Sequence, residues 1–177
     1  DWQKAFLQVP LGSEELATIL PIARMSLAES CIQVSRKGFV KKIKESQLET
    51  YIAKSYVGPG VKQPLDRTCS LTLCAKEDRL VMVSKAGFAL TLEMAQIPIT
   101  IEEAIRLSIT DHIITSFSVG TKPSLLVVTH NGKAIHRAIT WLEVATSLKT
   151  HGQPIFSQVR RDTGVRVVGA VPVSEQD

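Results

Sequence analysis

Three segments of the chain share one order of apolar, polar and glycine positions. They are residues 31–43, 80–92 and 125–137. Each begins with an apolar run, continues through Ser or Thr and two turn-forming residues to a glycine, and ends in a second β-prone run. Because glycine readily adopts the positive φ that a tight connection requires, this order predicts a β-hairpin in each segment.

The hairpins recur at a nearly constant interval. Their glycines, Gly38, Gly87 and Gly132, are 49 and 45 residues apart. Another short apolar run precedes each hairpin, at residues 18–22, 70–74 and 113–117. Several strands within one such period are typical of a propeller blade. The sequence therefore predicts an all-β fold, a β-propeller whose blades each have about four antiparallel strands.

The repeats divide the chain into five segments. Residues 1–16 are expected to be a lead-in strap or the end of a preceding blade. Blade repeats are expected at residues 17–66, 67–110 and 111–164, and a fourth begins at residues 165–177. Since the sequence stops inside this fourth repeat, we expect an incomplete propeller whose remaining blades lie elsewhere in the parent protein.

Two connecting segments are less clearly patterned. Residues 97–101 alternate as a strand does, whereas Thr100 and Glu103 have the spacing of a helix capping box. We favour a strand, because the repeat requires one there. Residues 46–51 are polar and fit a loop or a helical turn equally well.

Composition narrows the class of protein. Of the 177 residues, 44% are hydrophobic, which is enough for a buried core. Charged residues interrupt every apolar run well before the ~20 residues that span a bilayer, so we expect no membrane-spanning role. Cys31, Cys69 and Cys74 match neither a zinc site nor a disulfide framework, which favours a cytoplasmic protein. Cys69 and Cys74, five residues apart on an expected strand, should point to opposite faces as buried thiols.

The positive charge is concentrated in the first repeat. The net charge is +4, and residues 31–67 hold eight Lys or Arg against three acidic residues. Arg36 and Lys37 fall at the first hairpin turn, and Lys41, Lys42 and Lys44 follow it. Exposed cations along an edge can track the phosphates of a nucleic acid.

Several of these residues also carry a family resemblance. The segment Gln33–Lys44 (QVSRKGFVKKIK), followed by Gly58-Pro59-Gly60, resembles the blades of the C-terminal domains of type IIA topoisomerase A subunits, as in DNA gyrase and topoisomerase IV. Residues 167–177 resemble them too. The similarity covers roughly residues 17–177 and depends mainly on the recurrence of the pattern.

The resemblance implies a disc of about six blades, the β-pinwheel, around whose basic rim duplex DNA bends. Strand passage would be catalysed elsewhere in the ATP-hydrolysing enzyme, an isomerase. Gyrase also carries a Gln-Arg-Arg-Gly-Gly-Lys-Gly-like box that secures its tight wrap. The nearest segment here, Tyr56–Lys62, keeps two glycines but has Pro59 between them and lacks the arginines. Gyrase-like and topoisomerase IV-like roles therefore both stay open.

The charge pattern and the resemblance together predict a set of DNA-binding residues: Arg36, Lys37, Lys41, Lys42, Lys44, Lys62, Lys85, Lys133, His136, Arg137, Arg160 and Arg161. The resemblance implies three partners, namely double-stranded DNA, the rest of the A subunit and its ATPase B subunit. It also implies a cytoplasmic, nucleoid-associated protein and no cofactor in this segment.

Two other classes of function compete with DNA binding. A propeller can be a protein-interaction scaffold without binding DNA, since one fold supports many functions. An enzyme is disfavoured because no Gly-x-Ser-x-Gly elbow occurs and the four histidines lack metal-ligand spacing, so we expect no catalytic residue and no metal site. The sparse aromatic residues, including Phe117 and Trp141, are expected in the core or between blades rather than as a base-stacking platform.

Overall fold

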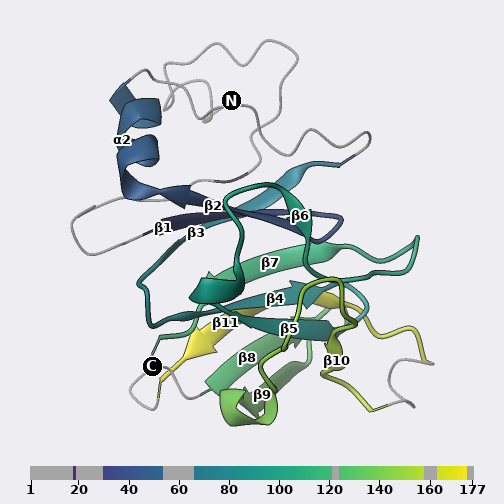
Figure 1. The fold of residues 1–177 in the computed structure, drawn as a ribbon. Helices are drawn as coiled ribbons and strands as arrows, with labels where there is room; N and C mark the ends of the chain where they lie inside the picture. Colours follow the sequence, from purple (N-terminus) through teal and green to yellow (C-terminus); the bar gives the residue numbers. More distant parts are fainter. Residues whose placement is uncertain (1–17, 19–29, 54–65, 121–123, 158–162, 175–177) are drawn as a thin grey trace, which may run out of the picture.

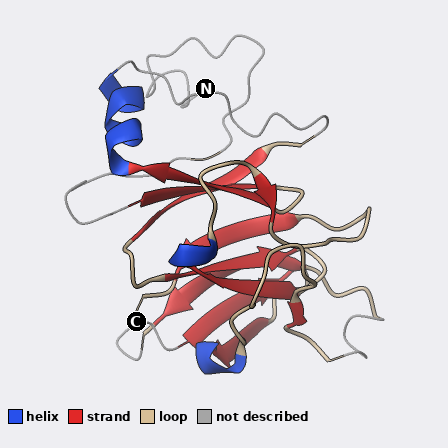
Figure 2. Cartoon of the chain, in the orientation of Figure 1, coloured by secondary structure: helices blue, strands red, loops and turns tan. Residues whose placement is uncertain are grey.

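The computed structural model describes residues 18, 30–53, 66–120, 124–157 and 163–174. These residues form three antiparallel sheets stacked face to face, with a single α-helix in the described part of the chain (Figure 1). Figure 2 shows that strands make up almost all the regular structure. The prediction of an all-β fold is confirmed.

Each sheet is built around one of the predicted hairpins. In spatial order, the first sheet contains β3 (Thr68–Cys74), β1 (Ser30–Ser35), β2 (Phe39–Lys44) and β6 (Glu102–Glu103). The second contains β10 (Gln153–Pro154), β5 (Phe88–Glu93), β4 (Arg79–Ser84) and β7 (Ile113–Ser118). The third contains β11 (Val167–Val173), β8 (Ser124–Thr129) and β9 (Ala134–Ala138). Sheets of about four antiparallel strands were predicted, and this is what the structure has.

The hairpin turns have the geometry that their sequence dictates. Gly38 has a φ of +86°, and its N–H donates to the carbonyl of Ser35 at 3.1 Å. The Ser35 hydroxyl in turn accepts a bond from the N–H of Phe39 at 3.0 Å. The same backbone bond closes the other two turns, from Gly87 to Ser84 at 3.0 Å and from Gly132 to Thr129 at 2.9 Å.

The sheets exchange strands between consecutive sequence repeats. β3 lies in the second predicted repeat, yet it pairs with β1 of the first. β7 pairs in the same way with β4, and β11 with β8. Short strands return to the opposite edge, where β6 pairs with β2 and β10 with β5. A sheet is therefore a different unit from a sequence repeat, and this exchange links neighbouring repeats.

Two apolar layers hold the stack together. Alternate residues of a strand face opposite sides of its sheet, so the middle sheet contributes to both layers. The first layer, between the first and second sheets, includes Ile32, Val34, Val40, Leu80, Met82 and Leu92. The second layer, between the second and third sheets, includes Val81, Val83, Ala89, Leu125, Val127 and Ala170.

The segment expected to be a loop or a helical turn is helix α2 (Glu45–Ala53). It follows β2 directly and covers the outer face of the first sheet, where Leu48 packs with Cys31 and Ile43. Burial of Leu48 against these residues explains why a largely polar segment is helical, since packing of one face contributes more to helix stability than propensity.

Two expectations from the sequence are wrong, and a third is wrong in one of its alternatives. Residues 97–101 form no strand; the 3-10 helix η2 (Met94–Gln96) precedes them, and the strand at this edge is β6. Cys69 and Cys74 pack against the same apolar layer, because the β3 register shifts opposite Val34 and Ser35 and changes the alternation. Trp141, in the 3-10 helix η3 (Ile139–Trp141), is 47% exposed and so is not in the core; its expected place between blades stays a prediction.

The cysteines are unpaired thiols. Cys31 and Cys74 are buried and Cys69 is half-buried. Burial raises the pKa of Cys31 and of Cys69 to about 11 and that of Cys74 to about 12. All three are thus protonated near neutral pH and act as small apolar side chains.

Candidate nucleic-acid interface

The hairpin turns of the three sheets lie in a row at one end of the stack, on the right in Figure 1. A repeating set of backbone bonds fixes this row. The N–H of Arg36 donates to the carbonyl of Arg67, just before β3, at 2.8 Å. The carbonyl of Arg36 accepts from the N–H of Ile113, in the second sheet, at 2.7 Å. The first turn is thereby joined both to its own sheet and to the next one.

The second and third turns repeat this arrangement. The N–H of Lys85 donates to the carbonyl of His112 at 2.8 Å, and the carbonyl of Lys85 accepts from the N–H of Val167 at 2.9 Å. The N–H of His130 donates to the carbonyl of Arg166 at 2.9 Å. In each sheet, the residue after the turn Ser or Thr therefore lies beside the residue just before β3, β7 or β11. The three pairs are Arg36 with Arg67, Lys85 with His112, and His130 with Arg166.

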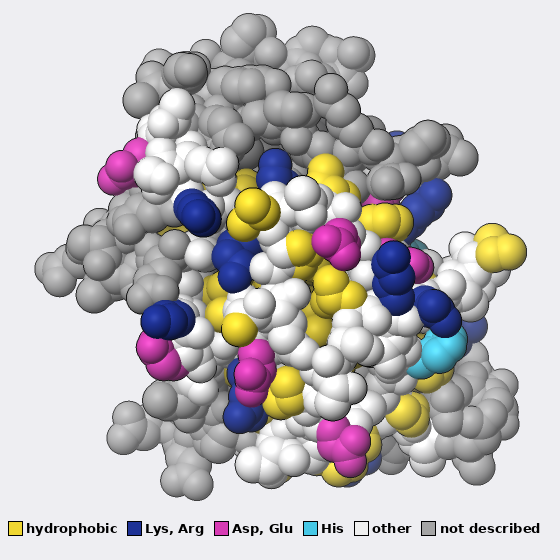
Figure 3. All heavy atoms as spheres, in the orientation of Figure 1, with side chains coloured by type: hydrophobic (Ala, Val, Ile, Leu, Met, Phe, Trp, Pro, Cys, Tyr) yellow, Lys and Arg dark blue, Asp and Glu magenta, His cyan; other side chains and the backbone are white. Residues whose placement is uncertain are grey.

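Basic residues occupy every one of these positions. We call the row the turn track, defined as Arg67, Arg36, His112, Lys85, Arg166 and His130. Its Lys and Arg side chains and His130 are exposed, and His112 is half-buried. Figure 3 shows Lys and Arg side chains, with a histidine among them, along the same right-hand edge. The fold thus collects cations from three sheets into one continuous line.

His112 joins two members of the turn track. Its Nε2 lies 2.8 Å from Nη2 of Arg36. A guanidinium has only donors, so Nε2 must accept this bond and the ring must be neutral. Burial lowers the pKa of His112, the charges of Arg36 and Lys85 lower it further, and Asp111 opposes them. The ring is thus held neutral between two permanent cations.

We expect the stability of the protein to fall as the pH drops below about 6.5, the ordinary pKa of a histidine. Because the folded-state pKa of His112 is lowered, the unfolded chain binds more protons between the two pKa values. The contribution is complete above the unfolded pKa and is lost as the pH falls through the folded one. Urea unfolding between pH 7.5 and pH 5 should show a smaller loss for His112→Gln than for the unmodified protein. An equal loss would contradict this assignment.

Two aspartates hold the first two turns against their sheets. Asp66 Oδ1 accepts from the N–H of Lys37 at 3.0 Å and of Arg67 at 2.8 Å. Asp111 Oδ1 accepts in the same way from Ala86 and from His112, both at 2.9 Å. In the third sheet Val165 takes the place of the aspartate, and the N–H of Arg166 donates instead to Nδ1 of His130 at 3.1 Å. The aspartates fix the turn backbone, and the Arg and Lys side chains of the turn track are exposed.

Asp111→Ala should lower the free energy of unfolding by about 1–3 kcal/mol, because two backbone donors lose a charged acceptor. Asp111→Asn is the matched control, since its amide oxygen can still accept both bonds. Chemical denaturation should therefore rank the unmodified protein above the Asn variant and the Asn variant above the Ala variant. Equal stability of the Ala and Asn variants would show that the two bonds contribute nothing.

The structure describes nine of the twelve predicted DNA-binding residues, and these fall into three groups, at the hairpin turns, along β9 and along β2. Arg36, Lys37 and Lys85 lie at the turns. Lys133, His136 and Arg137 are exposed and lie on or just before β9, which has no outer neighbour among the described residues. Lys62, Arg160 and Arg161 fall outside the described residues.

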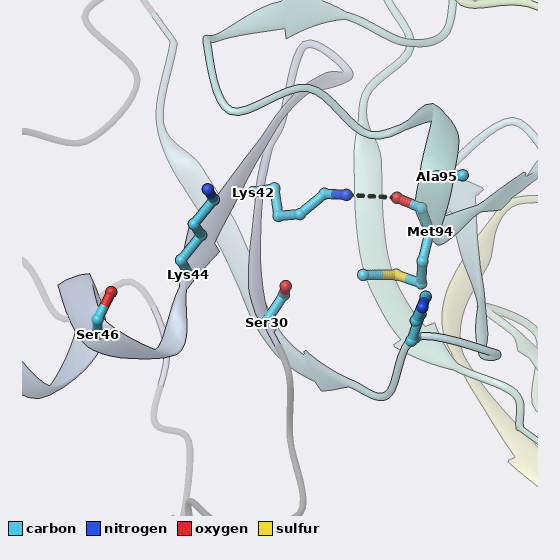
Figure 4. A pocket seen from close by; sticks show the side chains of 7 residues that line it. Ser30, Lys42, Lys44, Ser46, Met94 and Ala95 are labelled. Atoms are coloured by element: carbon cyan, nitrogen blue, oxygen red, sulfur yellow. Dashed lines mark hydrogen bonds between the residues drawn. The ribbon is translucent and has the colours of Figure 1, made fainter.

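The third group, the lysines of β2, does not form one stripe. Lys42 and Lys44 alternate with Lys41, so they lie on the opposite face of the sheet. Lys42 is half-buried, and its Nζ donates to the carbonyl of Met94 at 2.6 Å. Figure 4 shows its side chain reaching across a pocket toward Met94. Lys44 pairs with Ser30 and so lies at the far end of the hairpin from the turn track, whereas Lys41 pairs with Gln33 in the middle of the hairpin.

Sequence reasoning missed four members of the turn track: Arg67, His112, His130 and Arg166. Three of them precede the third strand of a sheet, in the triplets Asp66-Arg67-Thr68, Asp111-His112-Ile113 and Val165-Arg166-Val167. An alignment of these three triplets, like the alignment of the three turn glycines, shows a basic residue at the central position of each. His130 follows Thr129 as Arg36 follows Ser35, and the hairpin pattern itself pointed to it.

The described residues contain no group of three or more His, Cys, Asp or Glu that could hold a metal ion. No helix in the same part of the chain is long and apolar enough to cross a membrane.

Comparison with solved structures identifies the fold. A crystal structure of the C-terminal domain of DNA topoisomerase IV is 23% identical, with a TM-score of 0.73 over 93% of this chain and 52% of that domain. A DNA gyrase A C-terminal domain is 18% identical, with a TM-score of 0.73 over 95% and 57%. The C-terminal domain of E. coli ParC is 14% identical, with a TM-score of 0.63 over 82% and 62%.

The fold of this chain is therefore the β-pinwheel, the fold of the C-terminal domains of type IIA topoisomerase A subunits. The resemblance noted in the sequence is confirmed at the level of fold. The chain spans 52% to 62% of the length of the domains that it matches. No family model and no curated protein matches the sequence.

Proposed function

We propose that this chain is a DNA-binding and DNA-bending module of a type IIA topoisomerase A subunit. It would hold duplex DNA by its backbone, without reading the sequence, while the change of topology is catalysed by the rest of the A subunit together with the ATPase B subunit. The observation that carries this proposal is the turn track, a line of cations from three successive sheets.

The dimensions of the turn track support contact with a duplex. Stacked sheets lie roughly 10 Å apart, so a row across three sheets extends over about 20 Å. Duplex DNA carries one negative charge per ~1.7 Å of its axis, which offers many phosphates over that length. The track has four permanent cations, Arg67, Arg36, Lys85 and Arg166. Four phosphate contacts are therefore the natural upper count for this surface.

The contacts should be insensitive to sequence. Arg and Lys side chains at turns present charge to phosphates without entering a groove, and contacts of this kind position DNA without specifying bases. The described aromatic side chains offer no exposed row for stacking; Phe117 is buried, and Trp141 lies in η3. Recognition would then depend on charge and on the ease with which the duplex bends.

DNA bending provides the test. A duplex of about 40 base pairs is much shorter than the ~150 base pairs of the persistence length and stays nearly straight alone. With a donor and an acceptor dye at its two ends, binding of the chain should raise energy transfer, and equally for two unrelated sequences. Binding without any rise in transfer would reject bending, and strong preference for one sequence would reject backbone recognition.

One observation favours the alternative of a protein-interaction scaffold. Val128 and Val171 are large apolar residues of the third sheet that are 36% and 52% exposed. Leu126 pairs with Val171, so Leu126, Val128 and Val171 share the face that points away from the second sheet. An apolar interface there would be insensitive to salt, whereas phosphate binding weakens steeply with it.

A further inference from the structure

A cavity of about 640 Å³ lies at the opposite end of the strands from the turn track. Its described lining comes from three parts of the fold. Ser30, Lys42, Lys44 and Ser46 come from the first sheet and the start of α2, Lys76 from the turn between β3 and β4, and Met94 and Ala95 from η2. Pockets of this volume are of the size that holds small molecules or parts of larger ones.

The charged side chains among the described lining residues are all positive. Three lysines line the cavity, and no Asp or Glu is among its described lining residues. An anion held between the three lysines would be attracted to all of them. The hydroxyls of Ser30 and Ser46 add two neutral donors. This donor set suits a phosphate, which has several strong acceptor oxygens.

The position of Lys42 is fixed rather than free. The bond from its Nζ to the Met94 carbonyl, at 2.6 Å, holds the half-buried side chain across the cavity (Figure 4). Lys44 and Ser46 approach from the junction of β2 and α2, and Ser30 lies between them and Met94 (Figure 4). An ammonium that is already positioned loses little side-chain entropy when it binds an anion.

We propose that this cavity is a phosphate-binding site, separate from the turn track. Lys44 and Lys76 are its exposed cations, Lys42 is its anchored cation, and Met94 with Ala95 forms an apolar wall. The phosphate belongs either to a DNA backbone that continues around the stack or to a free oligophosphate, and both have the same chemistry. The site does not depend on DNA binding by the turn track.

Isothermal titration of the full chain with inorganic tripolyphosphate at low ionic strength tests the site. Saturable binding is expected, and Lys44→Gln or Lys76→Gln should each weaken it roughly 10-fold, the loss of one charge-assisted contact. Lys41→Gln is the matched control, because it removes one charge from the neighbouring position on the other face of β2. It should leave the affinity within about 2-fold, well inside the change that one lost contact produces.

Absence of saturable binding would overturn the proposal, and so would an equal loss in the Lys41→Gln control, which would indicate only a general effect of charge. Thermal unfolding of each variant checks that it is folded. Adding a short duplex to the tripolyphosphate complex distinguishes the two sources. Displacement assigns the cavity to backbone phosphate, and its absence assigns the cavity to a free oligophosphate. Duplex binding by turn-track variants is measured separately, so either proposal can fail without the other.

Discussion

The double variant Lys85→Gln/Arg166→Gln should bind duplex DNA roughly 10- to 100-fold more weakly than the unmodified chain at low salt, since each lost phosphate contact is worth about 1 kcal/mol or somewhat more. Both side chains belong to the turn track, one from the second sheet and one from the third. Their backbone bonds do not involve the side chains, so the substitutions preserve the row. Each lost contact should also reduce the slope of affinity against salt by about 1.

A control of equal charge separates the track from general electrostatic attraction. Lys41→Gln/Arg79→Gln also removes two positive charges, but Lys41 lies within β2 and Arg79 begins β4, at the far end of its hairpin from the turn. Fluorescence anisotropy with one labelled duplex compares the two double variants. If the control loses as much affinity as the track variant, the track is not the binding surface.

Gly38→Ala should lower the free energy of unfolding by about 2–5 kcal/mol, the largest stability effect that we expect from one methyl group. Gly38 has a φ of +86°, and an added Cβ would lie 2.5 Å from Cγ2 of Ile105 and 2.9 Å from its carbonyl oxygen. The first cost is backbone strain, and the second is displacement of the segment after β6. That segment also bonds to this turn, since the N–H of Ala104 donates to the Gly38 carbonyl at 2.8 Å.

Gly132→Ala measures the cost of backbone strain alone. Gly132 has a φ of +78° in the equivalent turn, but nothing lies within 4 Å of an added Cβ. Its substitution should therefore cost only the strain of the left-handed conformation, about 1–2 kcal/mol. Urea denaturation of both variants gives the difference. If the two substitutions cost the same, the contact between Ile105 and the first turn does not stabilise the fold.

Local features of this fold could be predicted from the sequence. The order Ser-x-x-Gly specifies its own turn, because the serine supplies the carbonyl and the hydroxyl and glycine supplies the positive φ. The pattern fixed neither the bulge at Cys69 nor the exposure of Trp141. A strand register and the burial of one aromatic ring depend on neighbours that are distant in the sequence.

In the turn track, too, some residues could be predicted from the sequence and others could not. Arg36 and Lys85 could be found because the hairpin pattern places both at turns. Their partners Arg67 and His112 follow 31 and 27 residues later and become neighbours only when β3 and β7 join sheets begun by earlier hairpins. The β2 lysines appeared equivalent as a run of charge, but alternation sends Lys41 to one face and Lys42 to the other. Strand exchange, which the repeat pattern does not reveal, creates the continuous track.

The most direct test of the central claim is the affinity of the unmodified chain for a duplex over a series of salt concentrations. Four phosphate contacts predict that log affinity falls with log salt at a slope of roughly −3 to −4, since each contact contributes about −0.9. A slope in that range, equal for two unrelated sequences, is the result that the turn track predicts. No measurable binding at low salt, or an affinity that does not change with salt, would contradict it.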